Sequence, residues 1–152
     1  MSWAAQRGVL VVAAAGNEGL NSDFFHFYPA DYELPNILSV TATDRNGQLL
    51  SVSNFGKATV DLAAPGKNIY STLPNGEHGY MTGTSQATAF VTGLAALVMA
   101  QDATLTKPEL LIHHLLKRGR PLASLRGRTR AESIINAEFA LKALRDDVAL
   151  EF

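Results

Sequence analysis

The feature that most constrains this chain is an apolar run near its start, Gly-Val-Leu-Val-Val-Ala-Ala over residues 8–14. It is rich in β-branched residues and holds no polar side chain, which is typical of a strand buried on both faces of a parallel sheet. The run ends in Ala-Gly-Asn-Glu-Gly over residues 15–19, a turn-forming sequence. Because ligands of open α/β sheets bind beyond the carboxyl ends of the strands, we expect Asn17 to lie where chemistry takes place.

After this strand, the sequence predicts further strands and then helices, as in an α/β domain with a mostly parallel sheet. Strands are predicted over Asn36–Thr43, Val60–Ala64 and, as a hairpin around an Asn-Gly turn, Asn68–Leu73 and His78–Thr82. Helices are predicted over Gln86–Gln101, over the segment from a Thr106–Glu109 capping box to Gly119, and over Ala137–Leu144. The first of these is apolar nearly all round, so we expect it to be buried on all sides. Loops are predicted over Leu20–Pro35, which is rich in aromatic residues, and Arg120–Arg130.

Size, charge and cysteine content exclude several classes of protein. The length fits one domain, residues 1–152. With 13 Lys and Arg against 14 Asp and Glu, the chain is not basic enough for a general nucleic-acid binder. The absence of cysteine excludes disulfide scaffolds, thiolate zinc sites and cysteine nucleophiles. The first residues lack a signal-peptide pattern, and the apolar run Ala87–Ala100 is too short to span a membrane, so we expect no membrane partner.

The segment Gly83-Thr84-Ser85 places a serine between the predicted hairpin and the start of the apolar helix. A nucleophilic hydroxyl is favoured there, because a helix N-terminus offers free N–H groups and a positive dipole end to a developing oxyanion. Taken alone, the pattern also fits an ordinary N-cap. The amide of Asn17 can donate a hydrogen bond to such an oxyanion, although taken alone Asn17 also fits a structural turn residue.

Four motifs in this order resemble the C-terminal half of the subtilisin-like serine peptidases, the subtilases. They are Ala-Ala-Ala-Gly-Asn-Glu-Gly over residues 13–19, Tyr28-Pro29-Ala30, Leu-Ala-Ala-Pro-Gly over residues 62–66, and Gly83-Thr84-Ser85 before an apolar helix. The resemblance extends from about Gly8 to about Leu144. It implies part of a doubly wound, mostly parallel subtilisin-like sheet in an α/β fold, and the hydrolysis of peptide bonds through an acyl-enzyme.

Carried onto this sequence, the resemblance makes Ser85 the nucleophile and Asn17 the oxyanion-hole residue, with the Ser85 N–H as second donor. One wall of the substrate pocket then consists of Ala14, Ala15 and Gly16. Glu18 lies at the rim of that pocket, where its carboxylate either favours a basic substrate side chain or is a solvated loop acid. After the serine, the commonest family form has Met, Pro and His where this chain has Gln86, Ala89 and Phe90, positions that shape the helix rather than the proton chemistry.

A serine hydroxyl needs a base, and the base needs an orienting acid. In subtilases both precede the oxyanion strand, in His-Gly-Thr and Asp-Ser/Thr-Gly motifs that this sequence lacks. Among its own histidines, His26 and His78 fit surface or packing roles. The order Ser85, Asp102, then His113 or His114 is that of an α/β-hydrolase, but these residues fall within a helix pair directly after the serine.

We therefore expect the C-terminal portion of a subtilase catalytic domain, present as a fragment or a truncated reading frame. Its substrate is a protein or peptide. The missing N-terminal half leaves one strand edge and one apolar face open, either to that half or to self-association. The alternative is a non-catalytic descendant of the family that acts as a binding or assembly module.

Cofactor, compartment and nucleic-acid binding complete the expectations. No cofactor or metal ligand is needed, and the resemblance allows only a weak structural calcium ion in the loop around Ala30 and Tyr32. Family members are mostly exported, which favours a secreted or periplasmic protein. The basic segment Lys117–Arg130 suits nucleic acid by charge, but it has no interleaved aromatic residue for base stacking, so we expect no nucleic-acid partner.

Overall fold

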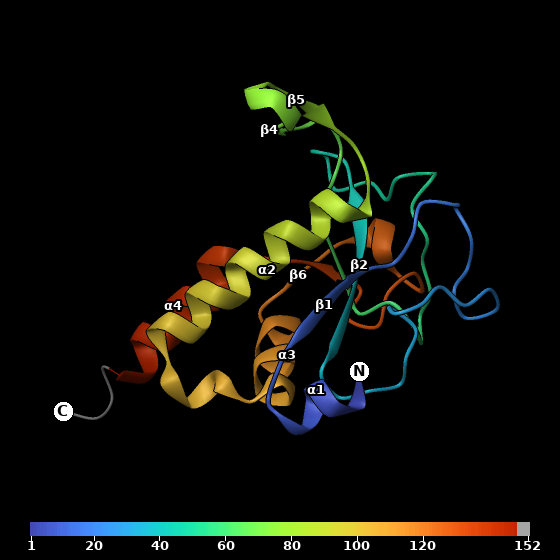
Figure 1. Ribbon diagram of the computed structural model, residues 1–152. Helices are drawn as coiled ribbons and strands as arrows, with labels where there is room; N and C mark the ends of the chain where they lie inside the picture. Colours follow the sequence, from blue (N-terminus) through green and yellow to red (C-terminus); the bar gives the residue numbers. More distant parts are fainter. Residues whose placement is uncertain (149–152) are drawn as a thin grey trace.

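A computed structural model describes residues 1–148 and shows a sheet with helices packed against it (Figure 1). The sheet has five strands in the order β1-β2-β3-β7-β6. Their bounds are Val11–Ala14 (β1), Ile37–Thr43 (β2), Leu62–Pro65 (β3), Arg120–Pro121 (β6) and Ser133–Ile134 (β7). All neighbours are parallel except β6 and β7. The predicted α/β class with a mostly parallel sheet is confirmed.

The register of the strands brings their carboxyl ends to one edge of the sheet. Ala14 pairs with Val40, and Val40 pairs with Leu62. Every residue of β2 is buried, whereas three of the four residues of β1 are only half-buried. Both faces of β1 are nevertheless covered as predicted, since Val12 packs against one apolar cluster and Ala13 belongs to another.

Four helices accompany the sheet: α1 (Ser2–Gln6), α2 (Thr84–Gln101), α3 (Pro108–Lys117) and α4 (Ala137–Val148). The long helix α2 lies against β1, β2 and β3 and also contacts α3 and α4. The main core consists of the inner face of α2 and the sheet residues beneath it, among them Leu38, Val40, Leu62, Val91, Leu94 and Val98. This packing fixes the N-terminus of α2 above the carboxyl ends of the strands (Figure 1).

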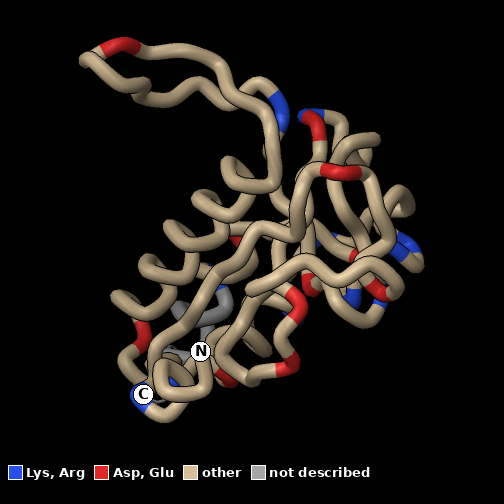
Figure 2. Tube along the Cα trace, turned by 45° about the vertical axis from the view of Figure 1, so that its right-hand side comes forward, with Lys and Arg blue, Asp and Glu red and all other residues tan. Residues whose placement is uncertain are grey.

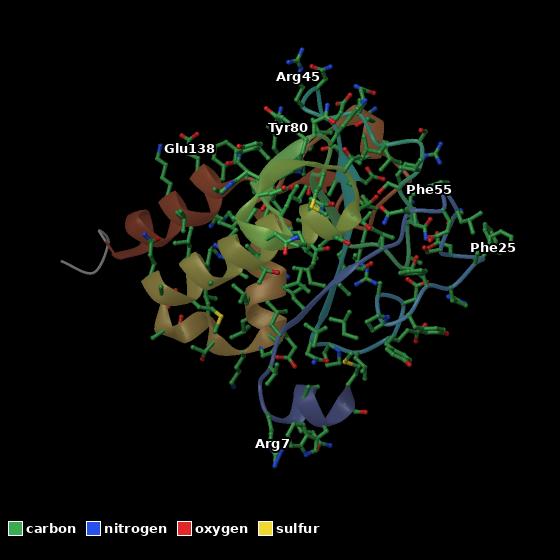
Figure 3. All side chains as sticks on the ribbon, turned by 45° about the horizontal axis from the view of Figure 1, so that its top comes forward. Arg7, Phe25, Arg45, Phe55, Tyr80 and Glu138 are labelled. Carbon is green, nitrogen blue, oxygen red and sulfur yellow. The ribbon has the colours of Figure 1, made fainter. Side chains whose placement is uncertain are left out.

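The predicted hairpin is a separate two-stranded ribbon of β4 (Ile69–Thr72) and β5 (His78–Met81), joined through the 3₁₀ turn Pro74–Gly76. It projects from the body of the molecule and leads directly into α2 (Figure 1). Asn75 and Gly76 have φ values of 64° and 77°, the left-handed conformation for which an Asn-Gly pair is favoured. The ribbon carries exposed aromatic side chains, including Tyr80, which is labelled in Figure 3.

Three helix predictions need correction. The helix predicted over Gln86–Gln101 begins two residues earlier, at Thr84. It is buried on one side only, since Phe90 is 45% exposed and Leu97 is 55% exposed. The Thr106 capping box does not form: Lys107 is the N-cap of α3 and makes no side-chain capping bond, while Thr106 ends a 3₁₀ turn over Ala103–Thr106.

The predicted loop Arg120–Arg130 also needs correction, because it contains β6 and the 3₁₀ turn Ala123–Leu125. The other predicted loop, Leu20–Pro35, holds no named strand or helix. Its aromatic side chains are largely exposed, as Figure 3 shows for Phe25, whose ring is 61% accessible.

Candidate active site

Asn17 and the N-terminus of α2 lie together although 67 residues separate Asn17 from Thr84. The Thr84 backbone N–H donates to Asn17 Oδ1 at 2.9 Å, and the Thr84 hydroxyl donates to the same oxygen at 3.2 Å. The Thr84 hydroxyl also accepts a hydrogen bond from Gly16 N–H at 3.3 Å. Because Oδ1 is held by two donors, the Asn17 amide nitrogen stays available as a donor on its other side.

Ser85 lies in the first turn of α2, directly after Thr84, and is exposed to solvent. The N-cap of the helix is Gly83, and no side chain makes a capping bond there. The reading of this serine as an ordinary N-cap is therefore wrong. The backbone N–H of Ser85 is among the first four amides of the helix, which have no acceptor within the helix. The site thus offers an exposed hydroxyl and a first-turn N–H beside the Asn17 side chain.

The end of β3 fixes the approach to the serine. Gly83 N–H donates to the Gly66 carbonyl at 2.9 Å. A side chain at position 66 would meet Ala42 Cβ at 2.6 Å and the Gly83 carbonyl at 2.7 Å, so only glycine fits there. The Pro65-Gly66 motif of the sequence therefore has a steric reason: it lets the segment before Ser85 lie against the sheet edge.

The predicted pocket wall follows the end of β1. Ala14 is half-buried, Ala15 and Gly16 are buried, and Glu18 is exposed. The Glu18 carboxylate is nevertheless held, because Asn54 Nδ2 donates to Glu18 Oε2 at 2.9 Å. Glu18 is therefore more than a freely solvated loop acid.

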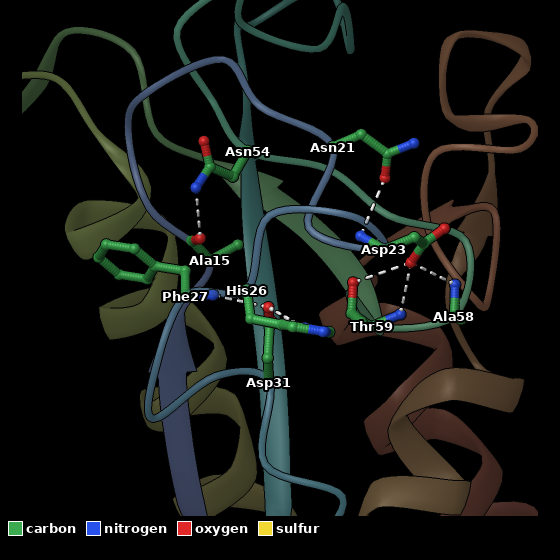
Figure 4. A network of polar contacts seen from close by, with 9 residues as sticks. All are labelled: Ala15, Asn21, Asp23, His26, Phe27, Asp31, Asn54, Ala58 and Thr59. Carbon is green, nitrogen blue, oxygen red and sulfur yellow. Dashed lines mark hydrogen bonds and ion pairs between the residues drawn. The ribbon is translucent and has the colours of Figure 1, made fainter.

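The histidines of the chain are engaged away from Ser85. His26 Nδ1 lies 3.5 Å from the buried carboxylate of Asp31, a pair that Figure 4 shows beside Phe27. His78 stacks on Tyr70 with ring centroids 5.9 Å apart. His113 is exposed, and His114 Nε2 lies 2.9 Å from the Ala140 carbonyl. These contacts fit the surface and packing roles expected of His26 and His78, and the absence of a histidine base for Ser85 stays a prediction.

The α/β-hydrolase order also fails on geometry. Asp102 follows the last residue of α2, and its carboxylate accepts hydrogen bonds from the Thr104 amide and hydroxyl. With a rise of 1.5 Å per residue, the helix separates Asp102 from Ser85 by about 25 Å.

An apolar groove lies beside Ser85, between the ribbon and the outer face of α2. Its volume is about 580 Å³. Besides Ser85, its lining includes Ile69, Met81, Phe90, Leu97 and Ile135. No lysine, arginine, aspartate or glutamate lies within α2, and Figure 2 shows the long helix free of charged residues. A contiguous apolar surface of this kind marks an interaction site rather than ordinary protein surface.

A second cavity, of about 530 Å³, lies beside the loop in which the resemblance allows a weak structural calcium ion. Asp61 lines it, and its buried carboxylate pairs with the Arg130 guanidinium at 3.0 Å. Burial raises the pKa of Asp61, against the Ser39 N–H and Arg130, which lower it. Among the residues that the structure describes, no three His, Asp or Glu side chains cluster in a way that would hold a metal ion. A guanidinium already neutralises the Asp61 carboxylate, and the weak calcium site that the resemblance allows in this loop stays a prediction.

The basic segment is partly engaged in the fold. Arg128 lies over the Phe55 ring with its guanidinium carbon 4.2 Å from the ring centroid, and Arg130 binds the Ala58 carbonyl in addition to Asp61. These contacts favour a structural role for both arginines.

Of the helices in residues 1–148, none combines the length and apolarity that crossing a membrane requires.

Two residues of the site were missed by the sequence analysis. Thr84 was noted only as a neighbour of the serine, and its hydroxyl is what joins Gly16 to Asn17. Asn54 lies between the predicted strands, and no pattern in the sequence distinguishes it from a turn residue. It contacts the Asn17 turn from beneath, and Figure 4 shows its bond to Ala15.

Comparison with known proteins gives consistent matches. The model of the subtilase family matches residues 1–133. Subtilisin-like protease 2 of Plasmodium falciparum is 34% identical over 89% of this chain and 10% of its own length. Subtilisin BL of Lederbergia lenta is 39% identical over 91% of this chain and 48% of its own length. A solved structure of the subtilase cytotoxin SubAB superposes with a TM-score of 0.82 at 28% identity, over 96% of this chain and 52% of that one. The chain thus spans about half or less of these relatives.

Proposed function

The chain belongs to the subtilase family of serine peptidases, and on that premise we propose that it is the nucleophile-bearing part of a serine endopeptidase. The observation that carries the proposal is the contact between Asn17 and Thr84. It places an amide donor next to the exposed serine at a helix N-terminus. That combination suits acyl transfer, since the attacking hydroxyl and the oxyanion donors then lie close enough to act on the same carbonyl group.

In the proposed reaction, Ser85 Oγ attacks the carbonyl carbon of the scissile peptide bond and gives up its proton to a base. The carbonyl oxygen becomes an oxyanion, which accepts hydrogen bonds from Asn17 Nδ2 and the Ser85 N–H. Collapse of this intermediate expels the amine, which takes the proton, and leaves an acyl-enzyme on Ser85 that water hydrolyses. Ala14, Ala15 and Gly16 line one wall of the pocket for the substrate side chain, with Glu18 at its rim.

The base and its acid lie, in this proposal, on a separate half-domain. Within residues 1–148, β1 has an unpaired edge and α2 has an uncovered apolar face, and the groove on that face includes Ser85. A segment that adds a strand to β1 and covers Phe90 and Leu97 would bring its own side chains to the serine. The relatives' additional length is consistent with such a segment. Without it, we expect the chain to self-associate through the same face. A secreted or periplasmic location stays a prediction.

The proposal is tested by mixing the chain with the N-terminal half of the Subtilisin BL catalytic domain and treating the mixture with a fluorophosphonate probe. We expect the probe to label Ser85. Ser85→Ala should abolish the labelling. The matched control is Ser71→Ala, because Ser71 is an exposed serine that lines the same groove, and it should leave the labelling unchanged.

Two outcomes contradict the proposal in different ways. If the two halves bind and Ser85 stays unlabelled, the chain is a binding or assembly module rather than part of a peptidase. If they do not bind at all and α2 stays uncovered, the proposed place of the base-bearing half is wrong.

A further inference from the structure

We propose that Asn54 is a positioning residue that fixes the Asn17 turn in the geometry the oxyanion hole requires. This role rests on the proposed function, because it matters for catalysis only if Asn17 contacts a reacting carbonyl. It concerns a residue outside the nucleophile, the oxyanion donors and the pocket wall. Asn54 acts through the backbone on both sides of Asn17 and does not itself touch the substrate.

The side chain of Asn54 uses all of its main hydrogen-bonding directions on this turn. Its oxygen accepts from the Glu18 N–H and the Leu20 N–H, both at 3.0 Å. Its nitrogen donates to the Ala15 carbonyl at 3.0 Å and to the Glu18 carboxylate at 2.9 Å. The two bonded segments lie before and after Asn17, so the turn that carries the oxyanion donor is held at both ends.

The backbone of Asn54 strengthens the same connection. Its N–H donates to the Gly16 carbonyl at 3.0 Å, and its own carbonyl accepts from the Thr41 hydroxyl at 2.6 Å. Thr41 belongs to the fully buried strand β2. Asn54 therefore connects the turn to the buried strand β2, and it is itself only 1% exposed.

Close packing makes this arrangement specific. Gly16 has a φ of 108°, and a side chain there would meet Asn54 Nδ2 at 2.4 Å and Glu18 Oε2 at 2.6 Å. The backbone of the turn thus lies directly on the Asn54 amide. Removing that amide leaves the Glu18 and Leu20 N–H groups without an acceptor and opens space beneath the turn, so Asn17 is expected to shift away from Ser85.

Amide hydrogen exchange of the chain itself tests the structural half of the proposal. In Asn54→Ala we expect the Glu18 and Leu20 amides to exchange at least about tenfold faster than in the native chain. The matched control is Asn36→Ala. Asn36 is also fully buried and holds the Val9 carbonyl at 2.9 Å, but it lies at the opposite end of β1. Asn36→Ala should leave exchange at residues 18 and 20 unchanged. If Asn54→Ala does not fold, Asn54→Ser replaces it, because a serine side chain is too short to reach both amides.

Turnover of a peptide substrate by the complex of this chain with the base-bearing half-domain tests whether Asn54 affects catalysis. Loss of an oxyanion donor in a related peptidase costs about 10²–10³-fold in kcat. We expect Asn54→Ala to lower kcat about tenfold or more, as a donor displaced rather than deleted would. The double variant Asn17→Ala/Asn54→Ala should be no slower than Asn17→Ala alone, since Asn54 acts only through Asn17. A merely structural defect would instead slow both backgrounds equally.

Each result separates this proposal from the preceding one. Unchanged exchange at residues 18 and 20 in Asn54→Ala overturns the positioning role, whatever the activity. Equal rate losses in the presence and absence of the Asn17 side chain overturn it as well. A native complex that shows no turnover counts against the proposed function, while the exchange measurement still decides whether Asn54 holds the turn.

Discussion

Replacing Thr84 by valine removes one hydroxyl from the centre of the site and keeps the shape of the side chain. The hydroxyl accepts from Gly16 N–H and donates to Asn17 Oδ1, and Thr84 is fully buried. In Thr84→Val the Gly16 N–H has no acceptor, and Asn17 Oδ1 keeps only the Thr84 N–H as donor. We therefore expect losses in both stability and reactivity.

The size of the stability loss follows from these contacts. A buried donor left without a partner costs about 1–3 kcal/mol, and a net hydrogen bond is worth about 0.5–1.5 kcal/mol. Both bonds are long, at 3.2 and 3.3 Å, which favours the lower part of each range. We expect Thr84→Val to lower the free energy of unfolding by about 2 kcal/mol, a fall in Tm of about 4–8 °C for a domain of this size.

Thermal unfolding of the chain measures the loss of stability. The rate of fluorophosphonate labelling at Ser85, in the mixture with the base-bearing half, measures the loss of reactivity. Thr84→Ser is the matched control, because it keeps the hydroxyl and loses only a methyl group. It should label at close to the native rate, whereas Thr84→Val should label about tenfold more slowly, a part of the loss expected for a missing oxyanion donor. A valine variant as stable and as reactive as the native chain would refute the role assigned to this hydroxyl.

Three further predictions concern other parts of the molecule. The Asp23 carboxylate accepts from the Lys57, Ala58 and Thr59 amides and the Thr59 hydroxyl (Figure 4), and although burial opposes the charge, these bonds lower its pKa below 3.8. Asp23→Ala should lower the free energy of unfolding by about 2 kcal/mol at neutral pH. In urea titrations, the difference between the native chain and the variant should be present in full above about pH 4, and it should be lost as the pH falls through the folded-state pKa of Asp23. Arg130→Gln leaves the Asp61 carboxylate unpaired and should cost about 2 kcal/mol, less than for a fully buried pair because the arginine side chain is 59% exposed. That cost should shrink as the pH falls and Asp61 is protonated, and a cost independent of pH would contradict the pairing. The double variant Phe90→Glu/Leu97→Lys should abolish self-association in gel filtration and change unfolding stability by less than about 1 kcal/mol, since both side chains are exposed; an unchanged elution volume for an associating native chain would refute the docking face.

The longer strands, and the places of Asn17 and Ser85 at the ends of elements, were predictable because each has a local signal. The apolar run before Asn17, the Asn-Gly turn of the ribbon and the small residues before Ser85 all lie in segments whose structure depends on neighbours in sequence. The parallel arrangement then brings Asn17 and the N-terminus of α2 to the same edge of the sheet. Short elements gave no such signal, since β6 and β7 have two residues each.

The rest depends on contacts between distant segments. The pattern of α2 predicted burial on all sides because both of its faces are apolar, but residues 1–148 cover only one of them. The Thr106 capping box does not form, because Thr106 is the last residue of a 3₁₀ turn whose N-cap is Asp102, and Lys107 is the N-cap of α3. The role of Asn54 arises from bonds to residues more than 30 positions earlier, which no local pattern records.

The most direct test of the central claim is a crystal structure of the complex with the base-bearing half after reaction with a fluorophosphonate. We expect a phosphorus–oxygen bond to Ser85 Oγ, with the phosphoryl oxygen about 2.7–3.1 Å from both Asn17 Nδ2 and the Ser85 backbone nitrogen. An adduct whose phosphoryl oxygen points away from Asn17, or one formed on a different residue, would contradict it.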